Sequence, residues 1–589
     1  MEDIHYEIWQ RKIILRLKER ACDSPEELLR SRVFSDILYE CIQSLKEQNS
    51  FLLNIFDNKE VDDERVRLLV RTLEFLAVLK GELVPRVVPG AEMFFRDPDL
   101  FNEFIEYLYN FWRSFDRFIL CDSTGNRFDI RPYRTFNLTI EHLTDLIRKT
   151  YRDLQENITG RHPKIYRQVE AGAEVAAIAF PAPVPFGAGI YKGLNDVPVI
   201  RQVLLFPPLI LNPPMNKRAG QFERTDTNPA QKVGLDPRDW LCYPAKVGEL
   251  IVLVYVYKEF YELGLSLCNL FEIADDEDLT RKPDAVYLYG IPEETAGLIH
   301  ENPTVFYDDT ENDILVASVP RGNAFSYFGY LKKMMLTLHN IRMMKAGRLP
   351  FHGALVRITL SGEREHNVLI IGDSGAGKSE SLEALRHMGR DRIQDFIVIA
   401  DDMGSLEIGP DMNIVAYGTE TGAFLRLDDL KPGYAFGQLD RSIIMNPGLT
   451  NARIILPVTP FEYVVRGHPV DFIFYANNYE EIDESHPVIE SFSTPESALE
   501  VFREGRVMSK GTTTTTGIVQ SYFANIFGPP QCRELHEELA ARFFHAFFDS
   551  GIFVGQLRTR LGVPGYETEG PEQAAVALLS LLEGGQAHG

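Results

Sequence analysis

The chain has 589 residues and a formal net charge of −24 at pH 7, from 61 Lys and Arg residues against 85 Asp and Glu residues. This excess of carboxylates argues against general binding to nucleic acids or membrane surfaces, because both usually need a basic protein surface. A composition of 45% apolar and 25% charged residues is typical of a folded globular protein. Disorder of the whole chain is therefore excluded.

The cysteines and the N-terminus indicate the compartment. The six cysteines lie far apart without CxxC spacing, which fits neither a disulfide framework nor a zinc cluster. Residues 1–20 lack the apolar core of a secretory signal. The longest apolar stretch, 171–191, contains three prolines that would break a membrane-spanning helix. We expect a cytoplasmic protein with no transmembrane segment.

Residues 1–157 form the first of three predicted segments. Apolar residues recur there at spacings of three and four with charged residues between them, which predicts amphipathic helices. Ser24 and Asp62 are candidate N-caps, because their side chains can accept hydrogen bonds from the first helical turn. We expect a helical extension that carries no chemistry and is a candidate surface for a protein partner.

The remainder of the chain predicts an α/β architecture. Residues 158–320 contain short β-branched and aromatic runs separated by Pro and Gly, which predicts strands in a mixed α/β domain. From 321 to 589 strands and helices alternate. The residues after Gly562 predict a terminal helix, and the run Thr512–Thr516 predicts a mobile loop. The strand-like runs are 174–183, 203–211, 249–257 and 285–291.

A glycine-rich loop lies between a predicted strand at 368–371 and a predicted helix. Its glycines allow successive backbone N–H groups to turn toward a triphosphate, and the helix N-terminus adds its positive dipole end. Lys378 would reach the terminal phosphates, and the hydroxyl of Ser379 would bind Mg²⁺. The alternative is a turn that binds no ligand. The loop consists of Gly372, Asp373, Ser374, Gly375, Ala376, Gly377, Lys378 and Ser379.

Other polar residues stand at the ends of predicted elements near this loop. Asp401 and Asp402 follow the next strand, where a divalent metal is commonly held, although a solvated loop is the alternative. His352 begins another strand and by itself fits a core or edge residue as well as a ligand. The pair Lys332 and Lys333 lies near a helix start and is normally a solvated face.

Taken in order, seven motifs resemble those of ATP-dependent phosphoenolpyruvate carboxykinase, whose P-loop kinase fold is shared with bacterial HPr kinase/phosphorylase. The interval from Lys333 to His352 is also that of the family. The resemblance covers Gly322 to about Arg560. The motifs are GNAFSYFGYLKK (322–333), PFHGALV (350–356), GDSGAGKSE (372–380), IADD (399–402), NARIILP (451–457), FREGRVMSKGTT (502–513) and SYFANIFG (521–528).

The resemblance implies a role for each matching residue. The phosphate loop would bind ATP, and residues 503–516 would form a lid. Tyr327 would contact the substrate, Lys333, His352 and Asp402 would hold Mn²⁺ or another divalent transition metal, Lys378 and Ser379 would bind phosphate and Mg²⁺, and Arg453 would contact the transferred phosphate.

An eighth match is TGRHPK at 159–164, which resembles the family's Thr-Gly-Arg-Ser-Pro-Lys. It implies that Arg161 binds a substrate carboxylate. Gly160 followed by Pro163 also fits an ordinary helix stop after the predicted helix that precedes it. The sequence does not decide between these two interpretations.

The implied protein is an α/β carboxykinase with mixed sheets. Its segments would be a helical extension at 1–157, a substrate-type domain at 158–320 and a P-loop carboxykinase-like domain at 321–589. It would convert oxaloacetate and ATP to phosphoenolpyruvate, CO₂ and ADP.

Two departures from the family keep alternatives open. Residues 377–380 read GKSE where carboxykinases have Gly-Lys-Thr-Thr, which is closer to HPr kinase and favours an alternative kinase acting on a protein or small-molecule hydroxyl. The family's Asn-Thr-Gly-Trp segment is replaced by VGQLRTRLG at 554–562, which leaves the nucleotide base contacts open. A third alternative is a nucleotide-sensing scaffold without catalysis.

Overall fold

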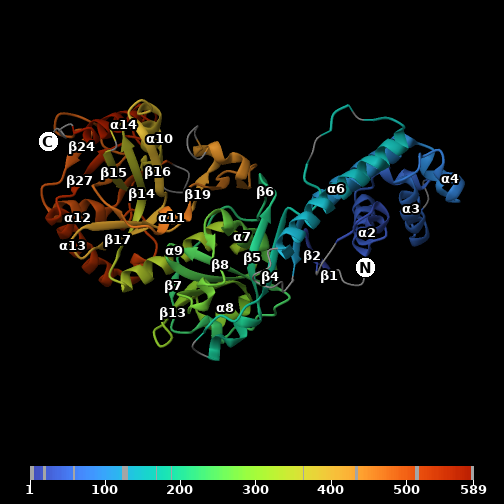
Figure 1. Ribbon diagram of the computed structural model, residues 1–589, viewed down its shortest axis with the longest axis horizontal. Coiled ribbons are helices and arrows are strands. Elements are labelled where there is room, and N and C mark those ends of the chain that lie inside the picture. The colour runs from blue at the N-terminus through green and yellow to red at the C-terminus, as the bar shows by residue number, and fades with distance from the viewer. Residues whose placement is uncertain are drawn as a thin grey trace. The chain divides into compact units, whose positions relative to one another are not determined.

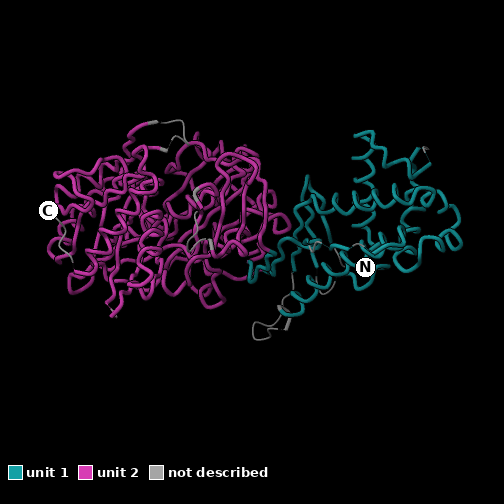
Figure 2. Tube along the Cα trace, turned by 90° about the horizontal axis from the view of Figure 1, so that it is seen from above, with its two compact units in different colours: residues 1–180, 200–206 teal, residues 181–199, 207–589 magenta. Residues whose placement is uncertain are grey.

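The computed structural model describes residues 5–17, 21–57, 60–121, 131–162, 164–166, 169–186, 189–362, 364–430, 436–510 and 516–584. The chain forms two compact units (Figure 2). Unit 1 comprises Met1–Phe180 and Ile200–Phe206, and unit 2 comprises Pro181–Val199 and Pro207–Gly589. Helices and mixed sheets occur throughout, which confirms the general α/β class. The division differs from the three predicted segments, because residues 158–180 belong to unit 1.

Among its described residues, unit 1 combines six α-helices with strands β1 to β4 and the greater part of β5 (Pro198–Leu205). Helices α2, α3, α5 and α6 bury their apolar faces in one core that includes Leu38, Leu69, Phe101 and Ile140. Ser24 Oγ and Asp62 Oδ1 accept hydrogen bonds from the first turns of α1 and α3, so both predicted N-caps are confirmed. The helices are α1 (Pro25–Leu29), α2 (Arg32–Glu47), α3 (Asp63–Leu76), α4 (Val84–Val87), α5 (Pro98–Arg113) and α6 (Arg131–Thr159).

The prediction of an all-helical extension is wrong, because residues 1–157 also contain three strands. The strands are β1 (His5–Trp9), β2 (Lys12–Leu17) and β3 (Asp116–Cys121), followed by β4 (Val175–Pro181). β2 pairs antiparallel with β1 and parallel with β3, and β3 pairs parallel with β4. β2, with the sequence KIILRL, is buried along almost its whole length. Such a short apolar run has no periodicity that separates a buried strand from a helix.

The first sheet of unit 2 is mixed, in the order β8–β9–β11–β13–β12–β7, with β10 beside β8. β5 begins in unit 2, where Val199 pairs with Cys242 of β8. The predicted strands at 174–183, 249–257 and 285–291 are confirmed as β4, β9 and β11. The elements are β5 (Pro198–Leu205), β7 (Glu223–Arg224), β8 (Trp240–Val247), β9 (Leu250–Tyr257), β10 (Glu272–Ile273), β11 (Ala285–Ile291), β12 (Val305–Asp309), β13 (Ile314–Pro320), α7 (Tyr261–Leu265) and α8 (Glu293–Ile299).

The second sheet of unit 2 carries the glycine-rich loop. Its order is β22–β18–β17–β14–β15–β23–β27–β24, with β16 also paired to β14. β15, β23 and β27 run parallel to one another. The strands are β14 (Leu349–Leu360), β15 (Arg364–Ile371), β16 (Ile393–Ala400), β17 (Met403–Ile408), β18 (Ile414–Gly418), β22 (His468–Pro469), β23 (Phe472–Asn477), β24 (Ile489–Ser491) and β27 (Phe553–Arg558).

Helices cover both faces of this sheet (Figure 1). On one face, Leu382 of α10 and Leu578 of α14 share a core with Phe474 of β23. On the other face, Tyr475 of β23 packs on Phe502 of α12, which packs on Phe544 of α13. Successive strand residues point to opposite faces, as Phe474 and Tyr475 do. The helices are α10 (Lys378–Met388), α11 (Phe461–Val465), α12 (Pro495–Glu504), α13 (Arg533–Asp549) and α14 (Glu569–Leu582).

Helix α9 (Phe328–Lys345) lies between the two large sheets of unit 2 and packs against strands of both, including β13 and β14. It is buried on nearly all its sides, as expected of a helix that is enclosed by other elements. Its buried polar residues, Lys332 among them, must therefore find partners inside the protein.

Two small sheets complete unit 2. One has the order β19–β21–β20–β6, and the other is the hairpin β25–β26. Residues 511–515, which include most of the Thr512–Thr516 run and part of the predicted lid, are outside the described residues. The strands are β6 (Leu209–Leu211), β19 (Gly422–Arg426), β20 (Ile443–Met445), β21 (Arg453–Pro457), β25 (Arg506–Lys510) and β26 (Thr516–Gln520).

Two further expectations can be compared with the structure. The six cysteines form no disulfide. Across the parts of the chain that the structure describes, none of the helices has the length and apolar character needed to cross a lipid bilayer.

The approach of β14 to β15 depends on Gly353. A Cβ atom at this position would lie 2.5 Å from the carbonyl oxygen of Ile370 and 3.0 Å from Cα of Ile371. We predict that Gly353→Ala lowers the free energy of unfolding of unit 2 by about 1–3 kcal/mol, since the strands must separate. Chemical denaturation measures this change.

Gly297 in α8 is the matched control, because a Cβ atom at this position would have no other atom within 4 Å. Gly297→Ala should be neutral or stabilising by roughly 0.5–1 kcal/mol, because alanine loses less backbone entropy than glycine in a helix. Equal stability of the two variants would contradict the close-approach argument.

Candidate functional site

The glycine-rich loop connects β15 to α10, as the sequence predicts. Gly375 and Gly377 have φ of +81° and +92°, values that favour glycine. The backbone N–H groups of Gly375, Gly377, Lys378 and Ser379 donate no hydrogen bond to any described residue. Unpaired donors at a loop followed by a helix N-terminus are suited to bind an anion such as phosphate.

Lys378 is the first residue of α10 and is buried. Its Nζ donates hydrogen bonds to the carbonyl oxygens of Gly372, at 2.5 Å, and Asp373, at 3.0 Å. Burial lowers the pKa of Lys378, while Asp402 and Asp373 act in the opposite direction. The ammonium group is therefore held against the loop and in the electrostatic range of Asp402.

Main-chain hydrogen bonds join the loop to the strand that carries His352. The carbonyl oxygen of His352 accepts from the N–H of Gly372 at 3.1 Å. The N–H of Gly353 donates to the carbonyl oxygen of Asp402 at 2.9 Å. Three chain segments that are far apart in sequence are thus fixed side by side at one edge of the second sheet.

The imidazole of His352 is 3% exposed and has one defined partner on each side. Nδ1 lies 2.5 Å from the carbonyl oxygen of Ala524, which can only accept, so Nδ1 carries a proton. Nε2 lies 2.9 Å from Oδ1 of Asp402, and this contact lowers the pKa of that carboxyl. A histidine nitrogen and a carboxylate oxygen at this distance can share a proton, and once Nε2 is deprotonated they are suited to share a metal cation.

The Ala524 carbonyl is presented by an unusual turn. Phe523, Ala524 and Asn525 have positive φ values of 44°, 58° and 61°, a conformation that costs energy for residues other than glycine. The ring of Phe527 stacks near His352 with centroids 6.3 Å apart. Strained backbone of this kind is concentrated at functional sites.

Lys332 links Asp402 to a second carboxylate. Its Nζ lies 2.6 Å from Oδ2 of Asp402 and 3.2 Å from Oε1 of Glu420. The side chains of Lys332 and Glu420 are each 4% exposed. Burial opposes the charge of Asp402, but Lys332 and His352 hold the pKa of this carboxyl well below its ordinary value. Burial raises the pKa of Glu420 to about 8, although Lys332 opposes this shift.

Lys333 has a different environment from Lys332. Its Nζ lies 4.9 Å from the ring centre of Phe527 and forms no ion pair with a described carboxylate. Burial and the positive charge of Arg218 lower the pKa of Lys333 to about 8. Asp402 is near enough to act on it electrostatically. Lys332 is therefore ion-paired, whereas Lys333 has no carboxylate partner among the described residues and loses its proton more readily than an ordinary lysine.

Arg453 and Tyr327 are brought to the same region by Phe424. The guanidinium of Arg453 lies 5.3 Å from the ring centre of Phe424, and the ring of Tyr327 lies 6.3 Å from it. Nε of Arg453 is buried without a hydrogen-bond partner among the described residues. This guanidinium therefore retains an unused donor.

Arg218 is a site residue that sequence reasoning missed. Its guanidinium packs on Phe222 at 4.5 Å, and Nη1 is buried without a partner among the described residues. Tyr330 fixes its loop by bonding to the backbone N–H of Ala219 at 3.0 Å. Burial lowers the pKa of Arg218, and its charge acts on Lys333. No motif surrounds Arg218 in the sequence that would have signalled this position.

Ser379 and Arg161 are not in contact with the His352–Asp402 pair. Ser379 is the second residue of α10, directly after Lys378. Arg161 lies in unit 1 and is exposed. It follows Gly160, whose φ of +68° ends helix α6, so this segment has the local geometry of a helix stop.

No group of three or more His, Cys, Asp and Glu side chains is placed to hold a metal ion within the described residues. The candidate set here has only two such side chains, His352 and Asp402, with Lys333 nearby. The sequence matches no protein-family model, and a search of curated proteins finds no significant relative.

Proposed function

We propose that this chain is an ATP-dependent carboxykinase of the phosphoenolpyruvate carboxykinase type, which converts oxaloacetate and ATP to phosphoenolpyruvate, CO₂ and ADP. The observation that carries the proposal is the hydrogen-bonded junction of three segments: the glycine-rich loop, His352 and Asp402. A loop suited to a triphosphate then lies beside a histidine–carboxylate pair suited to a cation. Such adjacency is what a transfer of phosphate to an enolate oxygen requires.

The basic residues and the backbone N–H groups of the loop would neutralise the negative charge of the ATP phosphates. The unpaired N–H groups of the loop would hold the phosphates, and Lys378 would move from its carbonyl partners to the terminal phosphate. Ser379 would bind the Mg²⁺ that accompanies ATP. The open Nε of Arg453 would donate to the phosphoryl group in transfer.

The residues around His352 fit a divalent transition metal such as Mn²⁺. The Nδ1 proton is committed to the Ala524 carbonyl, so Nε2, which faces the Asp402 carboxylate, is the ring nitrogen that would bind a metal once deprotonated. The Lys333 side chain has no carboxylate partner among the described residues, and its lowered pKa lets it give up a proton to bind a metal. When bound, the metal would supply Lewis-acid stabilisation of the enolate oxygen. Lys332 would keep Asp402 oriented through their ion pair.

The guanidinium of Arg218 has a buried donor without a partner among the described residues. This group is suited to bind an anionic group of the phosphoryl acceptor. Arg218 is beside Tyr327 and Tyr330 and acts electrostatically on Lys333. A guanidinium binds a carboxylate by two parallel hydrogen bonds. We assign the carboxylate contact of oxaloacetate to Arg218, where the family resemblance assigns it to Arg161.

The first test is a product assay with purified protein, oxaloacetate, ATP, Mg²⁺ and Mn²⁺. Phosphoenolpyruvate should form, and Lys333→Ala or His352→Ala should reduce its formation at least about a hundredfold, since these groups act on charge that develops in the transition state. ATP binding should be largely retained. The partly exposed Lys282 and the exposed His545 provide control alanine variants, which should have wild-type activity.

Full activity in both site variants would show that the metal assignment is wrong. ATP turnover that ignores oxaloacetate and depends on a hydroxyl-bearing protein or small molecule would instead establish the HPr-kinase-like alternative.

The second test compares the two arginines. Arg218→Gln should raise KM for oxaloacetate by about tenfold or more and leave KM for ATP nearly unchanged, because a charged hydrogen-bonded pair is lost only at the acceptor. Arg161→Gln should have little effect on either constant. The reverse result would return the carboxylate contact to Arg161.

A further inference from the structure

The glycine-rich loop is held from behind by two fully buried side chains, Asn478 and Thr559. Thr559 Oγ1 donates to the carbonyl oxygen of Ala376 at 2.7 Å. Asn478 Nδ2 donates to the carbonyl oxygen of Gly375 at 2.9 Å. Neither residue belongs to any motif that the sequence resemblance uses.

These two bonds determine where the loop's donors point. A peptide unit is planar and trans, so the N–H of one residue points opposite to the carbonyl of the residue before it. The bond to the Ala376 carbonyl therefore directs the N–H of Gly377 away from Thr559. The bond to the Gly375 carbonyl likewise orients the N–H of Ala376, which closes a turn on the carbonyl of Asp373 at 3.1 Å.

The contact at Gly377 is close. A Cβ atom on Gly377 would lie 2.4 Å from Thr559 Oγ1, so the loop backbone rests directly on this side chain. Gly377 is also the N-cap of α10 and its N–H has no partner among the described residues. A loop that binds phosphate needs the Ala376 carbonyl to point toward the protein interior and the Gly377 N–H to point toward the ligand.

The supporting residues are placed by the sheet. β15, β23 and β27 are parallel neighbours, and Asn477 of β23 pairs with Arg558 of β27. Asn478 and Thr559 follow these paired residues directly, so they emerge at the same edge of the sheet as the loop after β15. The N–H of Thr559 bonds the carbonyl of Asn477 at 2.8 Å, which joins the two supports.

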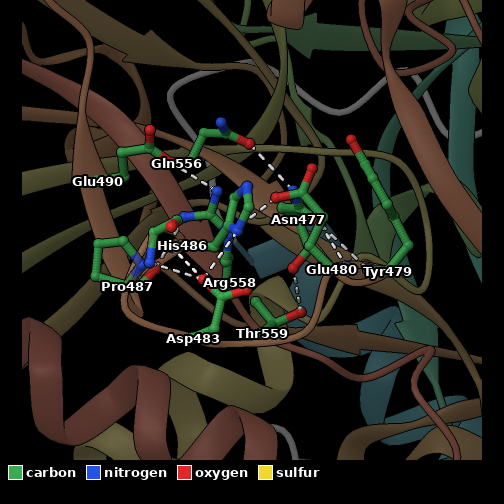
Figure 3. A network of polar contacts seen from close by, with 11 residues as sticks. Asn477, Tyr479, Glu480, Asp483, His486, Pro487, Glu490, Gln556, Arg558 and Thr559 are labelled. Carbon is green, nitrogen blue, oxygen red and sulfur yellow. Dashed lines mark hydrogen bonds and ion pairs between the residues drawn. The ribbon is translucent and has the colours of Figure 1, made fainter.

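An ion-pair network around the buried Arg558 fixes this edge (Figure 3). The guanidinium of Arg558 is 1% exposed and contacts Glu480 at 2.8 Å, Glu490 at 2.6 Å and the carbonyl oxygen of Pro487 at 2.9 Å. Asn477 accepts from the N–H groups of Tyr479 and Glu480 and donates to Gln556. The network restrains the backbone on both sides of the two supports.

Asn478 also connects the loop to the β25–β26 hairpin. Its Oδ1 accepts from the N–H of Met508 at 2.7 Å, and its Nδ2 donates to the carbonyl of Met508 at 3.0 Å. One amide side chain thus joins the phosphate loop, the end of β23 and strand β25. All its polar atoms are satisfied, so its orientation is fixed.

We propose that Thr559 and Asn478 are positioning residues for nucleotide binding, which hold the Ala376 and Gly375 carbonyls inward so that the Gly377 N–H faces the phosphates of ATP. This inference rests on the proposed function only in taking a nucleotide as the ligand. It does not depend on the identity of the acceptor.

The test measures the Kd for Mg–ATP by calorimetry together with the midpoint of thermal unfolding. Thr559→Val keeps the side-chain shape but removes the hydroxyl donor, and should weaken ATP binding about tenfold. Thr559→Ser keeps the donor and should bind ATP like the wild type. Asn478→Asp keeps the bond from the Met508 N–H but loses the donors to the Gly375 and Met508 carbonyls, and it should also weaken binding.

Thr304 is the matched control, because its buried hydroxyl donates to the carbonyl of Gln221 at 3.0 Å in the other sheet of unit 2. Thr304→Val should lower the unfolding midpoint as much as Thr559→Val but leave the Kd unchanged. A merely structural role for Thr559 would make the two variants alike in both readouts.

The outcomes separate this inference from the proposed function. Wild-type affinity in both Thr559→Val and Asn478→Asp overturns the positioning role and leaves the carboxykinase proposal intact. Nucleotide binding with the predicted losses, but without phosphoenolpyruvate formation, supports the positioning role and overturns the proposed acceptor. A wild-type protein that binds no ATP overturns both.

Discussion

One buried ammonium group, Nζ of Lys332, holds the candidate site together. It bridges Asp402 and Glu420, and Asp402 in turn contacts His352. A charge removed from water is tolerated only when opposite charges and hydrogen bonds replace the solvent. Lys332 therefore commits helix α9 to one position against the second sheet of unit 2, and the neighbouring Lys333 is carried into place with it.

The same arrangement answers the problem posed by the net charge of −24. The proposed ligands, ATP and a dicarboxylate, are anionic, so an acidic chain would need a local concentration of positive charge to bind them. Around Lys333 the structure gathers Arg218, Arg453 and Lys332 in one part of unit 2, while Lys378 lies in range of Asp402. Arg218 and Arg453 both retain buried donors without partners among the described residues. In a structural ion pair these donors would be satisfied by a carboxylate of the protein, whereas here they are available to an anionic ligand.

Local signals in the sequence predicted the local structure well. The glycine-rich loop, its flanking strand and helix, and the N-caps Ser24 and Asp62 depend on residues within one or two turns of each other. Strands β1, β2 and β3 of unit 1 were missed, and β2 shows why, because it is a buried run of six residues, too short to show its period. Single-sequence periodicity cannot report that another strand lies beside it.

Contacts of the site between residues that are far apart in the sequence could not be predicted from local patterns. The pairing of His352 with Asp402 was implied only by family resemblance, and the structure adds the geometry. Arg218 stands in a loop without a motif, and the Ala524 carbonyl is a backbone group, which no residue pattern reveals. Thr559 and Asn478 act through the backbone direction of a loop that is far from either of them in sequence.

The most direct test of the central claim is the position of Mn²⁺ in crystals grown with Mn²⁺ and ATP, located by its anomalous scattering. The account predicts one Mn²⁺ within about 2.5 Å of His352 Nε2 and of an Asp402 oxygen, with Lys333 Nζ completing the ligand set. A second ion at Ser379 and the phosphates is also expected. Mn²⁺ bound only at the phosphates, with Nε2 of His352 uncoordinated, would contradict the account.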